Sequence, residues 1–219
     1  MSKRCFDLAL SALGIIILCP LLCIIGLLVK LSDGGPVFFC QVRVGHRGRL
    51  FKIWKFRTMR VGADELGASV TRSADPRITR MGVFLRKLKL DELPQLFNVL
   101  AGEMSLVGPR PEVSKYVALY TPEQRRVLEL IPGITDLASL EFRDEEGLLA
   151  AALDVERFYR EFCIPRKIAL NLRHASRAST WQDFKIILRT IVAVMTKSRP
   201  LVFGEQTRNK AQVIIRRNR

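Results

Sequence analysis

An uninterrupted apolar run near the N-terminus constrains the fold of this chain more than any other feature. Residues 8–29, LALSALGIIILCPLLCIIGLLV, are 22 consecutive uncharged positions, about the length that crosses a hydrocarbon core as a helix. A cleaved signal peptide usually has a shorter apolar region that ends at a small-residue cleavage site, whereas this run passes directly into Lys30. The segment is therefore expected to attach the chain to a membrane.

Two features bear on how the segment attaches. Pro20 lies near its middle, where a proline removes a backbone hydrogen bond and kinks or breaks a helix. Basic residues, which tend to stay in the cytoplasm, flank both ends of the segment: Lys3, Arg4, Lys30, Arg43, Arg47 and Arg49. A bent, re-entrant helix that enters and leaves on one face meets both conditions, and a simple spanning helix is the alternative that the sequence leaves open.

The charge of the chain narrows the choice of partner. Lys and Arg number 36 against 21 Asp and Glu, so the 219 residues carry a formal net charge of +15. Such an excess favours nucleic acid, anionic lipid or a phosphorylated substrate. The five cysteines are odd in number and form no CxxC pair, which indicates reduced thiols. The length suits one domain with an ordinary core.

Turn residues predict a β-hairpin after the apolar run. Asp33-Gly34-Gly35-Pro36 is a strong turn signal, and strands are expected at 37–44 and 50–56 around a second turn. Lys55 and Arg57 have the spacing of two side chains on one face of an extended chain. They could contact phosphate or simply form the charged edge of the sheet. Residues 60–76 are expected to form a polar loop with a short helical piece.

The rest of the chain is predicted to be mainly helical. Helices are expected at 77–88, from Asp91 as an N-cap to Gly102, after Thr121, over 144–173 with an interruption near Pro165, and at 181–197 after Thr180 as a cap. The last helix is basic and amphipathic, which suits a membrane surface or packing on the core. The predicted fold class is mainly α with a small β-hairpin.

Two adjacent acids, Asp91 and Glu92, are the strongest chemical signal. A carboxylate at a helix N-terminus stays ionised, and the free amides there suit phosphate. Mg²⁺ takes one or two carboxylates, and an aspartate can attack phosphorus to give an acyl phosphate. With Arg86 or Arg110 to bind phosphate, the pair suits cleavage of a nucleotide-sugar diphosphate. Simple helix capping by Asp91 is the alternative.

Several motifs together make the chain similar to the bacterial sugar transferase family, the monotopic phosphoglycosyl transferases of glycan biosynthesis. They occur in family order over roughly residues 1–197, although any one alone would be weak. The matching residues are Gly35-Pro36-Val37-Phe38-Phe39, Arg43-Val44-Gly45, Phe51-Lys52-Ile53-Trp54-Lys55-Phe56-Arg57-Thr58-Met59, Asp75-Pro76-Arg77-Ile78-Thr79, Leu90-Asp91-Glu92-Leu93-Pro94-Gln95-Leu96, Met104-Ser105-Leu106-Val107-Gly108-Pro109-Arg110-Pro111 and Pro132-Gly133-Ile134-Thr135.

The resemblance implies a two-step transfer of sugar 1-phosphate from a UDP-sugar to polyprenyl phosphate, with undecaprenyl phosphate as the expected acceptor. Asp91 carries over as the nucleophile and as a Mg²⁺ ligand, and Glu92 as its partner that assists the metal or handles a proton. Arg110 resembles the phosphate-binding arginine of the proline-rich motif. Arg86, Lys55 and Arg57 are further candidates for phosphate contacts.

The resemblance also implies an organisation and a location. A re-entrant membrane helix at 1–32 precedes a catalytic domain at 33–197 that faces the cytoplasm at the bacterial inner membrane, with interfacial amphipathic helices, and a basic tail follows at 198–219. Membrane lipid is an expected partner, nucleic acid is not, and a homodimer is left open. The rival hypothesis is a non-catalytic, membrane-anchored basic protein that binds anionic lipid or nucleic acid.

The chain departs from the family pattern at two places. Cys19 stands where serine often precedes the membrane-helix proline, and a thiol is the weaker hydrogen-bond donor. Many members continue after Thr135 with glycine and a short motif ending in Gly-Arg, whereas this chain has residues 136–143, DLASLEFR. That segment is a candidate for reading an unusual sugar, with Arg143 as a substitute for the motif arginine.

Overall fold

The computed structural model describes residues 3–63, 75–150, 152 and 154–196. It is mainly helical with a small antiparallel sheet, as predicted. The predicted loop at 60–76 falls largely outside the described residues, and so does the basic tail at 198–219.

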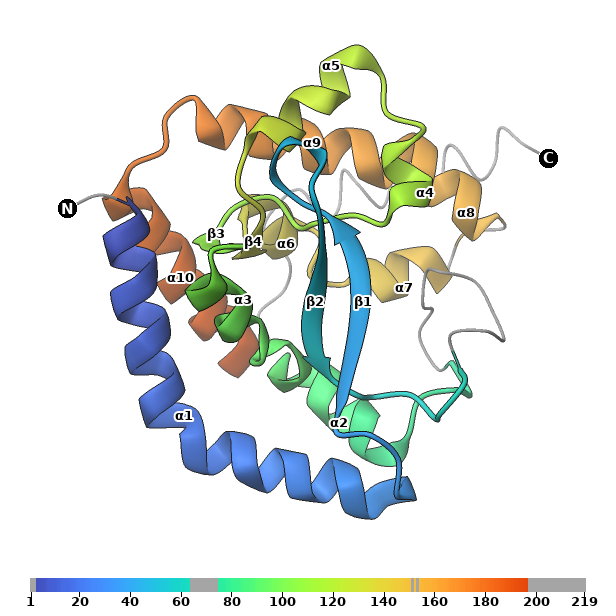
Figure 1. The fold of residues 1–219 in the computed structure, drawn as a ribbon. Helices are drawn as coiled ribbons and strands as arrows, with labels where there is room; N and C mark the ends of the chain where they lie inside the picture. Colours follow the sequence, from blue (N-terminus) through green and yellow to red (C-terminus); the bar gives the residue numbers. More distant parts are fainter. Residues whose placement is uncertain (1–2, 64–74, 151, 153, 197–219) are drawn as a thin grey trace.

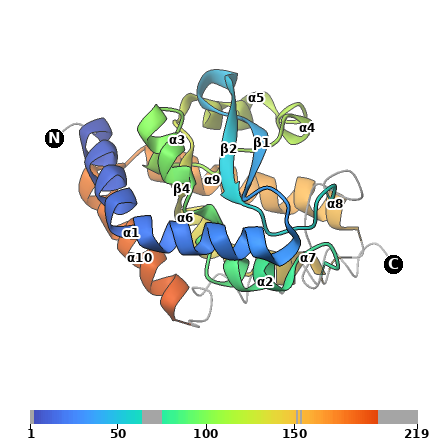
Figure 2. The ribbon, with the colours of Figure 1, turned by 60° about the horizontal axis from the view of Figure 1, so that its bottom comes forward.

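The apolar run forms one long helix, α1 (Lys3–Asp33), which wraps along the edge of the molecule. The helix bends between its two halves (Figures 1 and 2), and Pro20 is the proline inside it, a known cause of helix kinks. It is long and apolar enough to cross a membrane, and only 11% of its most apolar window is buried in the protein. This low burial distinguishes it from the core helix of a soluble domain.

The predicted hairpin is confirmed. Strands β1 (Phe38–Val44) and β2 (Leu50–Phe56) pair antiparallel, with Phe38 opposite Phe56 and Val44 opposite Leu50. The hairpin lies across the front of the helical elements in Figure 1. It begins five residues after α1 ends, so the turn at 34–37 joins α1 directly to the sheet.

The prediction that Asp91 is the N-cap of an α-helix is wrong. Helix α2 (Arg80–Lys87) begins at the cap Thr79, and a short 3₁₀ helix (Leu90–Glu92) precedes α3 (Gln95–Ala101). The amides of Glu92, Leu93 and Leu96 bond three residues back, and Pro94 has no N–H, so regular α-helix begins only after the proline. Gly102 ends α3 with a positive φ of 87°, as expected.

A second sheet was not predicted. Strands β3 (Ser105–Val107) and β4 (Gly133–Thr135) pair in parallel, and each has only three residues. The chains cross closely just beyond them, because a Cβ on Gly133 would lie 2.1 Å from the backbone nitrogen of Gly108. Glycine is therefore required at this crossing, which brings residues 108–110 beside residue 133.

Short helices build the remaining core. These are α4 (Ser114–Val117), α5 (Pro122–Arg125) with a 3₁₀ turn (Arg126–Glu129), α6 (Leu137–Glu141), α7 (Glu145–Ala150), and α8 (Val155–Phe158), followed by a π-helical turn (Tyr159–Cys163) and α9 (Ile164–Ala175). Thr121 and Gln124 form the capping box of α5. Pro165 lies in the first turn of α9, so the predicted interruption is a junction that the proline tolerates.

The last helix, α10 (Thr180–Met195), is capped by Ser179 and not by Thr180. It lies beside the first half of α1 in both views (Figures 1 and 2). Asp183 and Ile186 are its buried residues, whereas Leu188, Val192 and Met195 are exposed. Helix α1 also has exposed apolar side chains, including Ile16, Ile17 and Leu31, so both helices present apolar residues at the surface.

Candidate active site around Asp91 and Glu92

The two acids lie in the turn between α2 and α3, where Lys89 has a left-handed backbone with φ of 54°. This conformation turns the chain sharply before the 3₁₀ helix begins. Both side chains are buried: Asp91 is 6% exposed and Glu92 is 8% exposed. Two adjacent buried carboxylates repel each other and lose hydration, so their surroundings must stabilise at least one charge.

Glu92 is held by two cations. Arg110 donates from Nη1 to Oε2 at 3.0 Å and from Nη2 to Oε1, and Lys55 Nζ lies 3.1 Å from Oε1. Burial alone would raise the pKa of Glu92, but Arg110 and Lys55 hold that pKa well below its usual range. Glu92 in turn raises the pKa of Arg110. Glu92 is therefore an ionised anchor for both cations.

Asp91 has a different environment. Its Oδ1 is buried and accepts no hydrogen bond from any described residue. Burial, and then the charge of Glu92, raise the pKa of Asp91. The surroundings thus push the two carboxyl pKa values apart, a pattern that marks functional pairs. A buried oxygen without a partner is unusual and suits a cation or another bonding group.

Arg110 is placed by the crossing beyond β3 and β4. Gly108 N donates to Thr135 O and Gly133 N donates to Pro109 O, both at 3.0 Å. Asp136 then accepts from the Arg110 backbone N–H at 3.3 Å and from Asn171 Nδ2 at 2.7 Å, and its other oxygen caps α6 at Ser139. Asp136, a departure from the family pattern, therefore supports the backbone that carries Arg110.

Arg143 has a structural contact at the end of α10. Its Nη2 donates to the carbonyl oxygen of Thr196 at 2.7 Å, which ties the segment after α6 to the end of α10. Arg143 also lines a large cavity that is shared with Asp91 and Glu92. Its proposed role as a substitute for the motif arginine remains a prediction.

Arg43, Glu112 and Tyr159 were not singled out as site residues from the sequence. Arg43 Nη1 donates to Pro111 O at 3.2 Å, and the Tyr159 hydroxyl donates to Glu112 Oε1. Val44 N also donates to Glu112 O at 2.8 Å. These contacts join the end of β1 to the residues after Arg110. The sequence pointed to Arg43 only through the motif Arg43-Val44-Gly45, because the residues that it contacts are distant in sequence.

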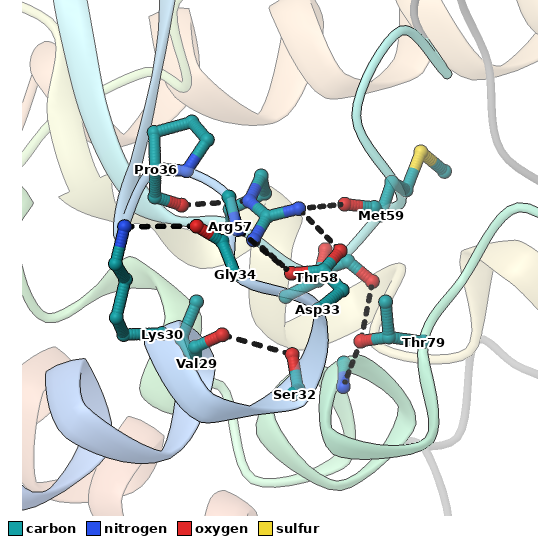
Figure 3. Close-up of polar contacts among 12 residues, drawn as sticks. Val29, Lys30, Ser32, Asp33, Gly34, Pro36, Arg57, Thr58, Met59 and Thr79 are labelled. Atoms are coloured by element: carbon teal, nitrogen blue, oxygen red, sulfur yellow. Dashed lines mark hydrogen bonds and ion pairs between the residues drawn. The ribbon is translucent and has the colours of Figure 1, made fainter.

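Lys55 and Arg57 do not act together, although their spacing suggested one face. Lys55 contacts Glu92, whereas Arg57 is 7% exposed and donates from Nη1 and Nη2 to the two carboxylate oxygens of Asp33. Arg57 also donates to Pro36 O at 2.7 Å and Met59 O at 3.3 Å (Figure 3). Strand β2 ends at Phe56, so Arg57 turns away and binds the end of α1.

A single large cavity of about 1360 Å³ connects these features. Lys55, Arg86, Asp91, Glu92 and Arg110 line one part of it, and apolar residues of α1 and α10 line another. Arg57 is absent from its described lining. Of the predicted site residues, the structure thus brings five to one cavity and places Arg57 elsewhere.

The acid pair has limited means to bind metal. No group of three or more His, Cys, Asp or Glu side chains among the described residues is arranged to hold a metal ion. Mg²⁺ commonly needs only one or two carboxylates and takes its other ligands from water and phosphate. The unpartnered oxygen of Asp91 therefore fits such an ion, while both oxygens of Glu92 already bind cations.

The structure thus combines a buried acid pair, a large cavity lined by cations, and one helix that is long and apolar enough to cross a membrane. Comparison with known proteins identifies the class: the profile of the bacterial sugar transferase family matches residues 1–197. The chain belongs to the bacterial sugar transferase family.

Three relatives illustrate the similarity. The undecaprenyl-phosphate glucose phosphotransferase of Komagataeibacter xylinus is 41% identical over 87% of this chain and 35% of its own length. The UDP-glucose:undecaprenyl-phosphate glucose-1-phosphate transferase of Escherichia coli K12 is 36% identical over 86% of this chain and 39% of its own length. The exopolysaccharide production protein ExoY of Rhizobium meliloti is 35% identical over 89% of this chain and 85% of its own length. The chain thus spans under two fifths of the first two relatives.

Proposed function

We propose that this protein is a phosphoglycosyl transferase that moves sugar 1-phosphate from a UDP-sugar to polyprenyl phosphate, most simply undecaprenyl phosphate. Such a transfer would be the first membrane step in building an exopolysaccharide, O-antigen or glycoprotein glycan. The observation that carries the proposal is the buried, unpartnered oxygen of Asp91 beside a cation-bound Glu92, in a cavity that reaches the membrane helix. The names of the relatives support the same substrates.

The proposed reaction has two displacements at the same phosphorus. A carboxylate oxygen of Asp91 attacks the β-phosphorus of the UDP-sugar, and the P–O bond to the α-phosphate breaks with its electron pair leaving on UMP. An oxygen of polyprenyl phosphate then attacks the acyl phosphate. The bond to Asp91 breaks, the carboxylate is regenerated, and polyprenyl diphosphate sugar is released.

The surrounding residues have separate proposed roles. Arg110 and Lys55 bind the phosphate oxygens, and Glu92 holds both cations in place between turnovers. Arg86 lines the same cavity and is a further phosphate contact. Mg²⁺, held by Asp91 and with Glu92 as the second candidate ligand, would neutralise the charge of the diphosphate when bound.

We propose a re-entrant topology because both ends of α1 bind the same domain. At the first end, Arg4 Nη1 donates to Val99 O at 2.7 Å, and Asp7 accepts from the Ser105 hydroxyl at 2.8 Å. At the other end, Asp33 binds Arg57. A spanning helix would instead separate its ends by a hydrocarbon core about 30 Å thick. The catalytic domain would then face the cytoplasm, with α10 at the membrane interface.

Replacement of Asp91 by Asn tests the reaction. We expect Asp91→Asn to abolish UMP release from UDP-sugars in detergent with Mg²⁺ and undecaprenyl phosphate, because an amide is a poor nucleophile. The variant should keep its thermal unfolding transition. Glu123→Gln, at an exposed acid on α5, is the matched control and should retain full activity. Mass spectrometry without acceptor should find sugar phosphate on Asp91.

Two results would count against this proposal. Substantial turnover by Asp91→Asn would exclude Asp91 as the nucleophile. If the unaltered protein releases no UMP from a full panel of UDP-sugars, the rival hypothesis of a non-catalytic protein that binds anionic lipid or nucleic acid is favoured.

Labelling of position 2 tests the topology. In a variant whose exposed cysteines Cys5, Cys19, Cys23 and Cys40 are replaced by serine, Ser2→Cys should resist a membrane-impermeant maleimide added from the periplasmic side. Permeabilised cells should label fully, which controls for reactivity. Labelling of intact spheroplasts would refute the re-entrant arrangement.

A further inference from the structure

We propose that the apolar arm of the central cavity, between α1, α3 and α10, takes the isoprenoid chain of the lipid acceptor. The inference rests on the proposed function for the identity of that acceptor. The arm is defined by Leu10, Gly14 and Leu18 of α1, Leu96 of α3, and Ile187 and Ile191 of α10.

The size and continuity of the cavity support a ligand with two parts. Its volume of about 1360 Å³ exceeds the range of roughly 300–1,000 Å³ for pockets that take a compact small molecule. Lys55, Asp91 and Arg110 line the same cavity, so a phosphate at these residues can continue into the apolar arm. A phosphate attached to a long hydrocarbon chain has this combination of chemistry.

The arm is chemically suited to hydrocarbon. Every described residue that α1 and α10 contribute to the lining is uncharged. The hydroxyl of Thr190, a polar group in this lining, already has hydrogen-bond partners within the protein. It lies 2.7 Å from the Thr135 hydroxyl and donates to Ile186 O at 2.8 Å. A nucleotide or sugar would lose hydrogen bonds in such a place, whereas an isoprenoid chain would lose none.

Gly14 keeps the arm open on the side of α1. A Cβ at this position would meet Leu96 Cδ1 at 3.5 Å, an ordinary contact distance. A larger side chain would therefore occupy the space between α1 and α3 and would not break the backbone. Glycine in the middle of a helix costs stability, so its presence here is consistent with a need for space.

The arm is bordered on α1 and α10 by exposed apolar side chains. Ile191 lines the arm and is 51% exposed, while its neighbour Val192 is 57% exposed and lies outside the described lining. On α1, Leu18 lines the arm, whereas exposed Ile17 does not. The chain of a membrane lipid can therefore enter between the helices without crossing a polar barrier.

These neighbouring positions supply matched variants. Leu18→Trp and Ile191→Trp fill the arm, and Ile17→Trp and Val192→Trp place the same side chain on the adjacent outer surface. Since each methylene kept out of an apolar site weakens binding by about fourfold, displacing two should raise the KM for undecaprenyl phosphate by more than about tenfold. The KM for the UDP-sugar and for a two-isoprene phosphate acceptor should change less than about twofold.

The result that would overturn the inference is equal behaviour within each pair. If the arm-filling variants leave the KM for undecaprenyl phosphate unchanged, or if the surface variants raise that KM to the same extent, the isoprenoid chain binds elsewhere.

A binding experiment separates this inference from the proposed reaction. A photoreactive undecaprenyl phosphate analogue should crosslink to peptides from α1 and α10 in the unaltered protein, and Ile191→Trp should reduce the yield while Val192→Trp should not. This crosslinking pattern can appear even if no UMP is released. In that case the proposed reaction is rejected and the binding of the isoprenoid chain in the arm is supported. Turnover with crosslinks confined to other elements would reject the apolar arm alone.

Discussion

Arg57 and Asp33 are expected to act as a structural pair that fastens the end of α1, and not as a phosphate contact. The Arg57 guanidinium has acceptors at Asp33, Pro36 and Met59. The backbone also passes directly over it, because a Cβ on Gly35 would lie 2.8 Å from Arg57 Cζ. Replacement of Arg57 by Met removes the charge and all of these donors while keeping an unbranched side chain.

The structure sets the size of the effect. Breaking a buried ion pair by removing one partner costs about 3–5 kcal/mol. The side chain of Asp33 is 26% exposed, so water can partly replace Arg57, and we expect Arg57→Met to lower the free energy of unfolding by about 3 kcal/mol. Asp33→Asn keeps one acceptor and loses one charge-assisted bond, which should cost about 2 kcal/mol. The double variant should lose less than the sum, because both changes break the same contact.

Urea unfolding in detergent measures these energies, and the KM for the UDP-sugar distinguishes the two roles of Arg57. A structural pair predicts that both single variants lose stability with little change in that KM. The reasoning is refuted if Arg57→Met stays within about 0.5 kcal/mol of the unaltered protein. It is also refuted if Arg57→Met raises the KM while Asp33→Asn has no effect on stability, which is the behaviour of a phosphate contact.

The same pair predicts a dependence on pH. The hydrogen bond from Arg57 is the largest cause that lowers the pKa of Asp33 below its usual value. Because the folded pKa is lower than the unfolded one, the stabilisation is complete above the unfolded value of about 3.9 and is lost as the pH falls through the folded value. The stability gap between the unaltered protein and Asp33→Asn should therefore shrink below about pH 4, as measured by thermal unfolding.

Three further predictions concern the acid pair and its support. Glu92→Gln leaves Arg110 and Lys55 without their shared carboxylate. The variant should therefore lose about 3 kcal/mol of unfolding free energy, measured in urea, and should release no UMP. Retained stability and activity would contradict the anchoring role of Glu92. Asp136→Asn places an amide donor against other donors and should lower both thermal stability and UDP-sugar affinity. The exchange Asp136→Asn with Asn171→Asp restores their mutual bond but not the acceptor for Arg110 N–H, so stability should recover while the KM stays raised. Recovery of both quantities would show that the Arg110 backbone contact is dispensable.

Local patterns made much of the fold predictable. The hairpin, the end of α3 at Gly102 and the start of a helix after Thr121 depend on residues close together in sequence, and each is confirmed. The prediction of a helix that begins at Asp91 was wrong, because the regular α-helix begins only at Gln95, after Pro94. The parallel pair of β3 and β4 was missed because three-residue strands are too short to show alternation, and their partners lie far apart in the sequence.

The choice of partner for each buried charge needed the tertiary structure. Spacing alone placed Lys55 and Arg57 together, but the end of β2 at Phe56 sends one to Glu92 and the other to Asp33. Asp136 looked like a departure that reads the sugar, and the crossing of β3 and β4 makes it an acceptor for Arg110. A sequence lists the charges, but the neighbours that desolvate and pair them are set by packing.

The long apolar N-terminal helix, the excess of positive charge, the hairpin and the adjacent acid pair can all be read from the amino-acid sequence, because they follow from composition and local periodicity. The packed fold was needed to show that Glu92 is paired while Asp91 has a buried oxygen without a described partner, and that both ends of α1 bind one domain. Burial and ion pairing depend on contacts between residues that are tens of positions apart, and no local pattern specifies such contacts.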